Sequence, residues 1–470
     1  MRLRALQGKL PIQLYGRRWV IVLFWSKFVC ILAEVSEFTA PFRKIFFMHR
    51  AFYLILMAMS PLISHAQAYT SFFTGDTADV QTSARQAYCL MGGRSENDEA
   101  MRWWLQRAAG GDVVVLRASG ADGYNQYLFS ELGVSVNSVQ TLVVPNLQAA
   151  NDPYVARQVS HAEAIWIAGG DQAVYLNAWR GTALHNALAF VGQTKRIPLG
   201  GTSAGMAVLG QYYFGAFSGS ALSATVLNNP FHSTVALGGR DFMNLDYLAN
   251  TITDTHFDNP DRKGRLITFM ARLAVDSGIR PLAIACDEYT AVCIDSAGMA
   301  RVFGEFPTHD DQAYFLQANC ISPALPETLQ NNLPLTWDRN GAAVKVYRVK
   351  GNLTGNNSFD LTNWQAGNGG EWFNWTVSNG LLTETPTSTV PQCSLATRIN
   401  EVSNPKLLVY PNPCLTSCKV EGYEGMYIVY DLLGRELISG HTSNGIPVQS
   451  LSNGLYLVKV GEHFVRILKG

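Results

Sequence analysis

The feature that most restricts the fold is a series of short apolar runs separated by stretches with a helical pattern. The runs are YCLMGG, DVVVLRAS, VQTLVVP, AEAIWIAGG and TKRIPLGG, all between residues 88 and 201. Continuous apolar runs of about four to six residues are typical of parallel strands buried on both faces. Segment 171–193 has the length and pattern of a crossover helix. The order predicts an α/β fold, a parallel sheet flanked by helices with right-handed crossovers.

The last run leads into Gly201-Thr202-Ser203-Ala204-Gly205, which fits the pattern G-x-S-x-G. A strand before the serine and a helix after it would form a nucleophile elbow, whose tight turn requires glycines beside the strained serine. The helix start would leave the Ala204 N–H available to an oxyanion. We expect Ser203 to be a nucleophile, although a glycine-rich loop gives the same pentapeptide.

A second motif, GGDQ at Gly169–Gln172, directly follows an apolar run and therefore lies at a carboxyl end of the predicted sheet, where open α/β folds bind ligands. Its glycines allow backbone N–H groups to approach a substrate carbonyl. We expect Gly170 to stabilise the oxyanion together with Ala204, and Gln172 to orient the substrate. The alternative is a turn in which Asp171 caps a helix.

A third motif, DTHFDNPDRKGRL at 254–266, contains His256. A serine hydroxyl needs a base to take its proton, and His256 has the best setting among nine histidines, with acidic neighbours before it and arginines after it. We expect His256 to be the general base. Arginines in such a loop can hold a substrate carboxylate through two hydrogen bonds.

Together the three motifs resemble the cyanophycinase and dipeptidase E family of serine peptidases, whose fold is similar to that of class I glutamine amidotransferases. The resemblance covers Tyr88 to Val349. It implies that Ser203 is the nucleophile and His256 the base. The positions that it implies line the substrate site are Gln172, Asp254, Arg262 and Arg265.

Two departures from the family pattern bear on activity. Pro260 stands where the family commonly has a further arginine, which puts cyanophycin in doubt as the substrate. The family also supplies an acid between nucleophile and histidine, yet no glutamate lies between Ser203 and Asp254. Asp241 and Asp246 are the acids in that interval, and the sequence does not say whether either reaches His256.

The last 70 residues, 401–470, have alternating strand patterns split by Pro, Asn and Gly turns, which predicts a small all-β sandwich domain. YPNP, YDLLGREL and LSNGLYLVKV occur there in the order typical of the type IX secretion system sorting domain, which this stretch resembles. That resemblance implies contact with the type IX secretion machinery, export through the periplasm and across the outer membrane, and removal of this domain. A carbohydrate-binding sandwich is the alternative.

The residues before 67 have the sequence pattern of a leader segment. Residues 48–66 have the basic start, apolar run and small residues of a signal peptide, which makes residues 1–47 an overextended start. A membrane anchor at Trp19–Ala33 is the alternative. Between leader and sorting domain we expect a peptidase domain at 67–345 and a Gly, Asn and Trp-rich β appendage with linker at 346–400.

The composition, with 47% hydrophobic residues, favours a globular protein over a disordered one. Lys plus Arg and Asp plus Glu both number 36, so no net charge favours nucleic acid as a partner. No histidine spacing completes a metal site, and we expect no cofactor. Cys286/Cys293 and Cys414/Cys418 are either disulfides or buried small residues.

The resulting hypothesis is a secreted serine peptidase that cleaves an isopeptide or aspartyl peptide bond in a peptide substrate through an acyl-enzyme, with a homodimer compatible with the sequence. A catalytically weak homologue that binds acidic peptides is the first alternative, favoured by Pro260 and the missing glutamate. An α/β-hydrolase esterase is a second, and the short interval between Ser203 and His256 argues against it.

Overall fold

The computed structural model describes residues 67–391 except 322, most of residues 408–469, and two strands nearer the start. The gaps in the later part are residues 411–413, 422, 432–434, 453 and 462. The early strands, β1 (Ile21–Trp25) and β2 (Phe28–Leu32), pair antiparallel. The expected signal peptide at 48–66 lies outside the described residues, as do residues 392–400 at the end of the expected appendage and linker. Within the described part of the chain, no helix has the length and hydropathy to cross a membrane.

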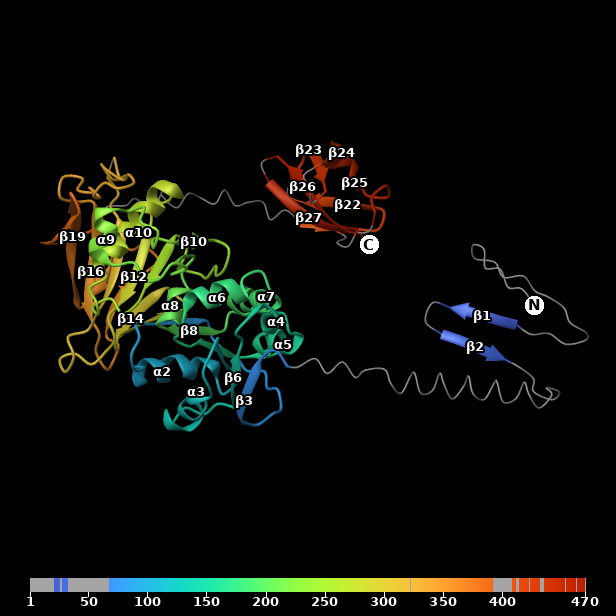
Figure 1. The fold of residues 1–470 in the computed structure, drawn as a ribbon, viewed down its shortest axis with the longest axis horizontal. Helices are drawn as coiled ribbons and strands as arrows, with labels where there is room; N and C mark the ends of the chain where they lie inside the picture. The colour runs from blue at the N-terminus through green and yellow to red at the C-terminus, as the bar shows by residue number, and fades with distance from the viewer. Residues whose placement is uncertain are drawn as a thin grey trace, which may run out of the picture. The chain divides into compact units, whose positions relative to one another are not determined.

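The predicted parallel sheet is confirmed (Figure 1). The five apolar runs form β4 (Ala87–Met91), β5 (Asp112–Arg117), β6 (Ser138–Val143), β7 (Ala164–Ile167) and β8 (Pro198–Thr202). They pair in parallel in the order β4-β8-β7-β5-β6. Since parallel neighbours share one direction, the loops after all five strands lie at one edge of the sheet.

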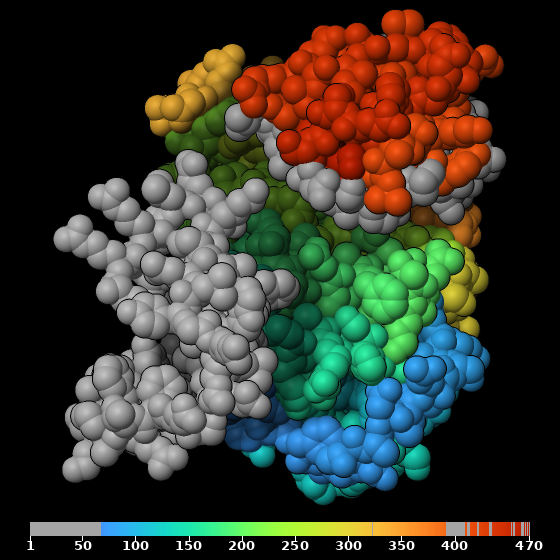
Figure 2. All heavy atoms as spheres, turned by 90° about the vertical axis from the view of Figure 1, so that its right-hand side faces the viewer, coloured from blue at the N-terminus to red at the C-terminus, as the bar shows by residue number. Residues whose placement is uncertain are grey.

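Antiparallel strands extend this sheet to ten strands. At one end β3 (Thr70–Gly75) pairs with β6, and Figure 2 shows the blue start of this part packed beside the later, teal segments. At the other end lie β13 (Ala291–Asp295), β14 (Met299–Phe303), β17 (Asn357–Asp360) and β18 (Gly367–Asn368). The sheet is therefore mixed, with its parallel strands in the interior and near one edge.

Helices cover both faces of the parallel strands (Figure 1). On one face Cys89 and Trp166 pack with Met101 and Trp104 of α2 (Asp98–Leu105). On the other face Leu90 and its neighbours pack against the helices that follow β6, β7 and β8. Besides α2, the helices between β5 and residue 207 are α3 (Gly123–Gln126), α4 (Leu147–Ala150), α5 (Pro153–His161), α6 (Gln172–Trp179), α7 (Ala183–Ala189) and α8 (Ala204–Ala207).

A second, eight-stranded sheet follows in the order β10-β9-β11-β12-β15-β16-β19-β20. Its strands are β9 (Tyr212–Phe214), β10 (Leu237–Gly239), β11 (Thr251–Asp254), β12 (Leu282–Cys286), β15 (Gln312–Ala318), β16 (Val344–Lys350), β19 (Gly370–Ser378) and β20 (Leu381–Thr387). β11 and β12 are parallel, and α10 (Lys263–Asp276) packs beside α9 (Ser223–Asn228).

The expected border between residues 345 and 346 falls inside β16, which pairs with β15 on one side and β19 on the other. The described residues from 346 to 391 are therefore not a separate appendage. They complete both large sheets, because β17 and β18 join the first sheet while β16, β19 and β20 join the second. Turn-rich composition marked the connections here but could not reveal which strands the segment would pair with.

Residues 408–469 form the predicted small all-β domain. One sheet has the order β21-β22-β25 and the other β24-β23-β26-β27, and the strand pairs are antiparallel. The strands are β21 (Leu408–Tyr410), β22 (Ser417–Glu421), β23 (Met426–Tyr430), β24 (Glu436–His441), β25 (Ile446–Pro447), β26 (Gly454–Val460) and β27 (His463–Lys469). Cys414 and Cys418 are buried in the shared core.

Cys286 and Cys293, which lie close together in the sequence, do not form a disulfide. Cys286 and Cys293 are buried thiols on different strands, and the Sγ atom of Cys293 lies 3.7 Å from that of Cys89 on the neighbouring strand β4. The spacing left two interpretations open, a disulfide or two buried small residues, and the structure supports the second.

Candidate active site

Ser203 stands on a sharp turn between β8 and α8. Its backbone angles, φ 52° and ψ −119°, lie outside the regions that residues with a side chain normally adopt, so the turn is strained. Gly205 allows the turn, because a Cβ atom there would lie 2.0 Å from the carbonyl oxygen of Ile167. The strand, turn and helix expected around the serine are all present.

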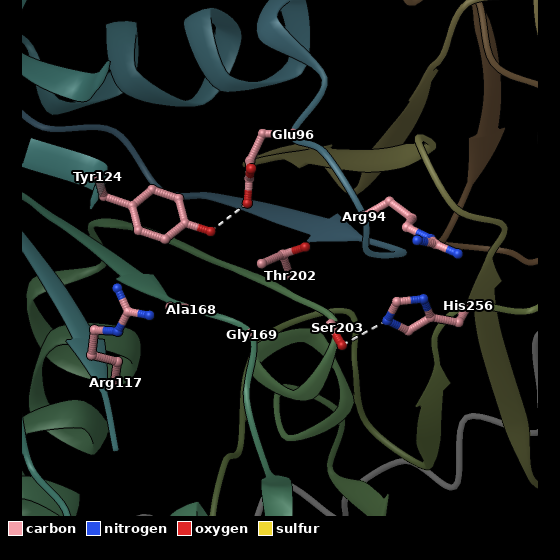
Figure 3. A pocket seen from close by; sticks show the side chains of 9 residues that line it. All are labelled: Arg94, Glu96, Arg117, Tyr124, Ala168, Gly169, Thr202, Ser203 and His256. Carbon is pink, nitrogen blue, oxygen red and sulfur yellow. Dashed lines mark hydrogen bonds between the residues drawn. The ribbon is translucent and has the colours of Figure 1, made fainter. Parts of the chain in front are cut away.

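The hydroxyl of Ser203 meets the imidazole of His256, with Oγ 2.8 Å from Nε2 (Figure 3). His256 follows β11, and its backbone N–H donates to the carbonyl of Gly92 at 2.8 Å. Gly93 provides the space for the ring, because a Cβ atom there would lie 2.4 Å from the imidazole. The loop after β4 thus packs directly against the base, and sequence reasoning had not singled out either glycine.

A carboxylate supports the far side of the imidazole. Oε1 of Glu288 lies 2.7 Å from Nδ1 of His256, and the Glu288 side chain is only 8% exposed. Its other oxygen accepts from Nε of Arg94 at 2.8 Å and from Nδ2 of Asn259 at 3.4 Å. Burial alone would raise the pKa of Glu288, but the hydrogen bonds from His256, Arg94 and Asn259 outweigh it and lower that pKa below its usual value.

The acid was sought in the wrong interval of the chain. Glu288 lies after His256, not between the serine and the histidine. Because β11 and β12 are parallel neighbours, the residues that follow them, His256 and Glu288, meet at one edge. The apolar run before Glu288 was the sequence signal that could have predicted a strand there, with Glu288 at its carboxyl end. Asp241 bonds to Arg180 and Tyr213, and Asp246 bonds to Gln86 and Arg196, so both have other partners.

The GGDQ loop lies across from the serine, where a Cβ atom on Gly169 would be 3.5 Å from the Cβ of Ser203. The Tyr175 hydroxyl donates to the carbonyl oxygens of Ala168 and Gly169, at 2.9 and 3.1 Å. In a trans peptide the N–H points opposite to the C=O, so the N–H groups of Gly169 and Gly170 point away from Tyr175. Asp171 also caps α6 by accepting from Ala173 N at 2.9 Å.

A cavity of about 320 Å³ opens beside the serine. Its walls are the ends of β4, β5, β7 and β8 with the loops after them, together with His256 after β11, and it contains charges that the motifs did not predict. The lining residues are Arg94, Glu96, Arg117, Tyr124, Ala168, Gly169, Thr202, Ser203 and His256. Among the described residues, no group of His, Cys, Asp or Glu side chains is arranged to hold a metal ion.

Two residues expected to line the substrate site do not line this cavity. Asp254 and Arg265 form a bidentate ion pair with side chains only 5% and 4% exposed, and Thr255 N donates to Asp254 at 2.8 Å. The expectation is corrected for both, because each already has a buried partner. The pair instead stabilises the end of β11, from which His256 projects.

Gln172 and Arg262 lie near the site but are not among the residues that line the cavity. Gln172 is the first residue of α6 and is partly exposed. Arg262 donates to the carbonyl of Thr255 at 2.8 Å, while its buried Nε has no partner in the described structure. Desolvation and the neighbouring Arg265 lower the pKa of Arg262. Both residues remain candidates for contacts with a longer substrate.

Two family models match the chain. The model of peptidase family S51 matches residues 123–299, a segment that includes Ser203, His256 and Glu288. The model of the secretion system C-terminal sorting domain matches residues 408–467. A domain of the latter kind directs its protein through type IX secretion to the cell surface or the extracellular space.

Curated relatives agree with the first match. Cyanophycinases of Synechococcus elongatus and Thermosynechococcus vestitus are 30% identical to the chain over 208 residues, or 43% of this chain and 59% of each relative. The cyanophycinase of Geminocystis herdmanii is 27% identical over 179 residues. The chain thus spans less than two thirds of the length of these relatives.

Solved structures of peptidases also align with the chain. A peptidase from an acI-B1 Actinobacterium is 14% identical with a TM-score of 0.35, covering 50% of this chain and 91% of its own. A putative peptidase E from Listeria monocytogenes is 14% identical with a TM-score of 0.27, covering 47% of this chain and 100% of its own. The family models carry the comparison: residues 123–299 are similar to peptidase family S51, and residues 408–467 are similar to the secretion system C-terminal sorting domain.

Proposed function

We propose that the chain is a secreted serine peptidase that hydrolyses an isopeptide or aspartyl peptide bond through an acyl-enzyme. The observation that carries this proposal is the continuous hydrogen-bond chain from Ser203 through His256 to Glu288 on a strained strand-to-helix turn. A nucleophile bonded to a base that is oriented by a third group is the arrangement that nucleophilic catalysis requires.

In the first step the Oγ atom of Ser203 attacks the substrate carbonyl, and its proton moves to Nε2 of His256. The negative charge that develops on the carbonyl oxygen is stabilised by the N–H of Ala204 and by the Gly169–Gly170 loop. When the carbon–nitrogen bond breaks, His256 gives the proton to the leaving nitrogen. Water then attacks the acyl-enzyme while His256 takes a proton from it, and His256 returns that proton to Oγ of Ser203 as the ester bond breaks. Glu288 holds the imidazole tautomer and stabilises its positive charge throughout.

The catalytically weak homologue that binds acidic peptides rested on two grounds. One was the lack of an acid for His256, and Glu288 offers that acid. The other, Pro260 in place of an arginine, still disfavours cyanophycin as the substrate. The esterase alternative gains no specific observation.

The test is labelling of the purified protein with a fluorophosphonate probe, compared with Ser203→Ala and His256→Ala. We expect one labelled site, lost in Ser203→Ala and slowed by orders of magnitude in His256→Ala. No labelling that depends on Ser203 would refute the peptidase. Release of a reporter amine from α-aspartyl and β-aspartyl amides then tests the bond class, whereas turnover of short acyl esters alone would favour an esterase.

A further inference from the structure

Two buried thiols face each other across β4 and β13, the strands on either side of the catalytic base and its acid in the sequence. Cys89 lies directly opposite Cys293 in the antiparallel pairing of these strands, and the two Sγ atoms are 3.7 Å apart. Both residues are 0% exposed and belong to one core cluster with α2, where Sγ of Cys293 also lies 3.9 Å from the carbonyl oxygen of Ala100. The proposed reaction uses neither thiol.

The register of the two strands suits a disulfide between these cysteines. Gly92 N donates to Thr290 O at 2.9 Å, and this pair continues the register in which Cys89 lies opposite Cys293. Hydrogen-bonded and non-hydrogen-bonded pairs alternate along an antiparallel ladder, so the cysteines, three positions farther along, form a non-hydrogen-bonded pair. Cα atoms in such pairs are about 4.5 Å apart, and disulfides join Cα atoms at about 4.4–6.8 Å. The bond would therefore close with the strands in their present register.

Export gives this pair of thiols an oxidising environment. A sorting domain of the kind that residues 408–467 resemble directs its protein through type IX secretion to the cell surface or the extracellular space. Disulfides form and persist outside the cytoplasm, whereas cytoplasmic thiols are kept reduced. Two thiols already in contact are therefore the pair that oxidation would join first.

We propose that Cys89 and Cys293 form a structural disulfide in the exported protein. The oxidant is a disulfide of the compartment through which the chain is exported. The thiolate of one cysteine attacks that disulfide, releases one thiol and forms a mixed disulfide, and the thiolate of the other cysteine then attacks the first and releases the second thiol. The two cysteines together lose two protons and two electrons, and the electrons reduce the oxidant to two thiols.

The exchange takes place while the chain folds, before α2 covers the pair. Burial raises the pKa of Cys293, so its thiol in the folded protein is a poor nucleophile, and with no exposed surface it is closed to an oxidant. The same burial then protects the finished bond from reductants.

The disulfide would reinforce the strands that support the catalytic residues. Cys89 is three residues before Gly92, whose carbonyl oxygen accepts from His256 N at 2.8 Å. Cys293 is five residues after Glu288, the acid bonded to the imidazole. The inference does not depend on the peptidase mechanism, because it concerns the link between two strands and not the reaction at the serine.

Peptide mapping of the protein collected after export tests the proposal directly. The full chain is unfolded in iodoacetamide, which blocks thiols but not disulfides, and is then digested without reductant. We expect one peptide containing Cys89 linked to one containing Cys293, and the two should separate on reduction. Alkylation of both residues, or a link from either of them to another cysteine, would overturn the proposal.

Thermal unfolding with and without reductant measures what the bond contributes. A disulfide stabilises mainly by restricting the unfolded chain, and this one would close a loop of 204 positions. Reductant should therefore lower the Tm of the wild type by roughly 5–15 °C more than it lowers that of Cys89→Ala or Cys293→Ala. A remaining effect in these variants is expected, because Cys320 is also disulfide-bonded.

Cys286→Ala is the matched control. Cys286 is equally buried, but it packs in the core cluster on the other face of the sheet, with its Sγ 3.6 Å from the carbonyl oxygen of Leu90. It should respond to reductant like the wild type. The same response in Cys89→Ala as in Cys286→Ala would contradict a disulfide at Cys89.

Discussion

The two large sheets contribute to the site in different ways. The ten-stranded sheet supplies Ser203, Gly169 and the cavity walls from the ends of β4, β5, β7 and β8, which are mutual neighbours in one parallel array. The eight-stranded sheet supplies His256 and Glu288 from the ends of β11 and β12. The nucleophile thus comes from one sheet, and the base with its acid comes from the other.

Backbone hydrogen bonds hold these two contributions together. His256 N donates to Gly92 O at 2.8 Å, Gly92 N donates to Thr290 O at 2.9 Å, and Tyr289 N donates to Gly93 O at 3.2 Å. The loop after β4 and the turn after β12 are therefore hydrogen-bonded to each other beside the imidazole. The alignment of Ser203 with His256 therefore depends on contacts between the two sheets. Variants in the eight-stranded sheet should lower the reactivity of Ser203, although the serine belongs to the ten-stranded sheet.

The largest effect is expected at Glu288. Glu288→Gln keeps the shape of the side chain but removes the charge that orients and stabilises the imidazole, so turnover should fall by a factor on the order of 10⁴. The rate of fluorophosphonate labelling and the hydrolysis of aspartyl amides are the measurements.

Asp241→Asn and Asp246→Asn are the matched controls, because both acids lie between Ser203 and His256 in sequence but have other partners. Both should label within a few-fold of the wild type. If either control lost as much activity as Glu288→Gln, the assignment of the acid would be wrong.

The sequence predicted the contribution of the ten-stranded sheet to the site better than that of the eight-stranded sheet. The elbow at Ser203 is a local pattern of strand, turn and helix, and the parallel order of the apolar runs placed Gly169 near it. Glu288 was missed because its distance to His256 depends on the pairing of β11 with β12, and no local pattern encodes that pairing. Asp254 and Arg265 were misassigned for a related reason, since a short motif of charges does not reveal that they are buried against each other.

The second largest effect is expected on stability. Arg265→Met would leave the carboxylate of Asp254 buried and unpaired, which typically costs about 3–5 kcal/mol. Thermal unfolding of the purified protein measures the loss. Asp276→Asn on the same helix removes an exposed ion pair with Arg272 and should change stability by less than about 1 kcal/mol. Equal losses would show that burial does not set the value of the first pair.

A third effect depends on pH and concerns Asp287, the neighbour of Glu288. Burial, and then the charge of Asp258, raise the pKa of Asp287 to about 8. A carboxyl whose pKa is raised on folding stabilises the protein fully below its unfolded pKa, and that stability is lost as pH rises through the folded pKa. The Tm of the wild type should therefore fall between pH 5 and pH 9.

Asp287→Asn removes this titration while keeping an oxygen that can accept from Gln312 N. Its Tm should fall less steeply over the same range and exceed that of the wild type at pH 9. Asp122→Asn, at an exposed position without a side-chain capping bond, is the control and should follow the wild type. Parallel curves for Asp287→Asn and the wild type would rule out the buried carboxyl as the cause.

The smallest effect is expected at Arg94, whose side chain is 56% exposed. Exposed ion pairs contribute little, so Arg94→Gln should slow labelling only by a few-fold. Because Arg94 helps to lower the pKa of Glu288, its removal should raise that pKa and move the acidic limb of the pH–rate profile to higher pH. An unmoved limb would mean that Arg94 does not act on Glu288.

The most direct test of a site shared between the two sheets is a double-mutant cycle on the labelling rate of Ser203. If Glu288 acts only through His256, the double variant His256→Ala, Glu288→Gln should label as fast as His256→Ala alone, to within a few-fold. Multiplication of the two single effects in the double variant would contradict this account, because Glu288 would then act independently of the imidazole.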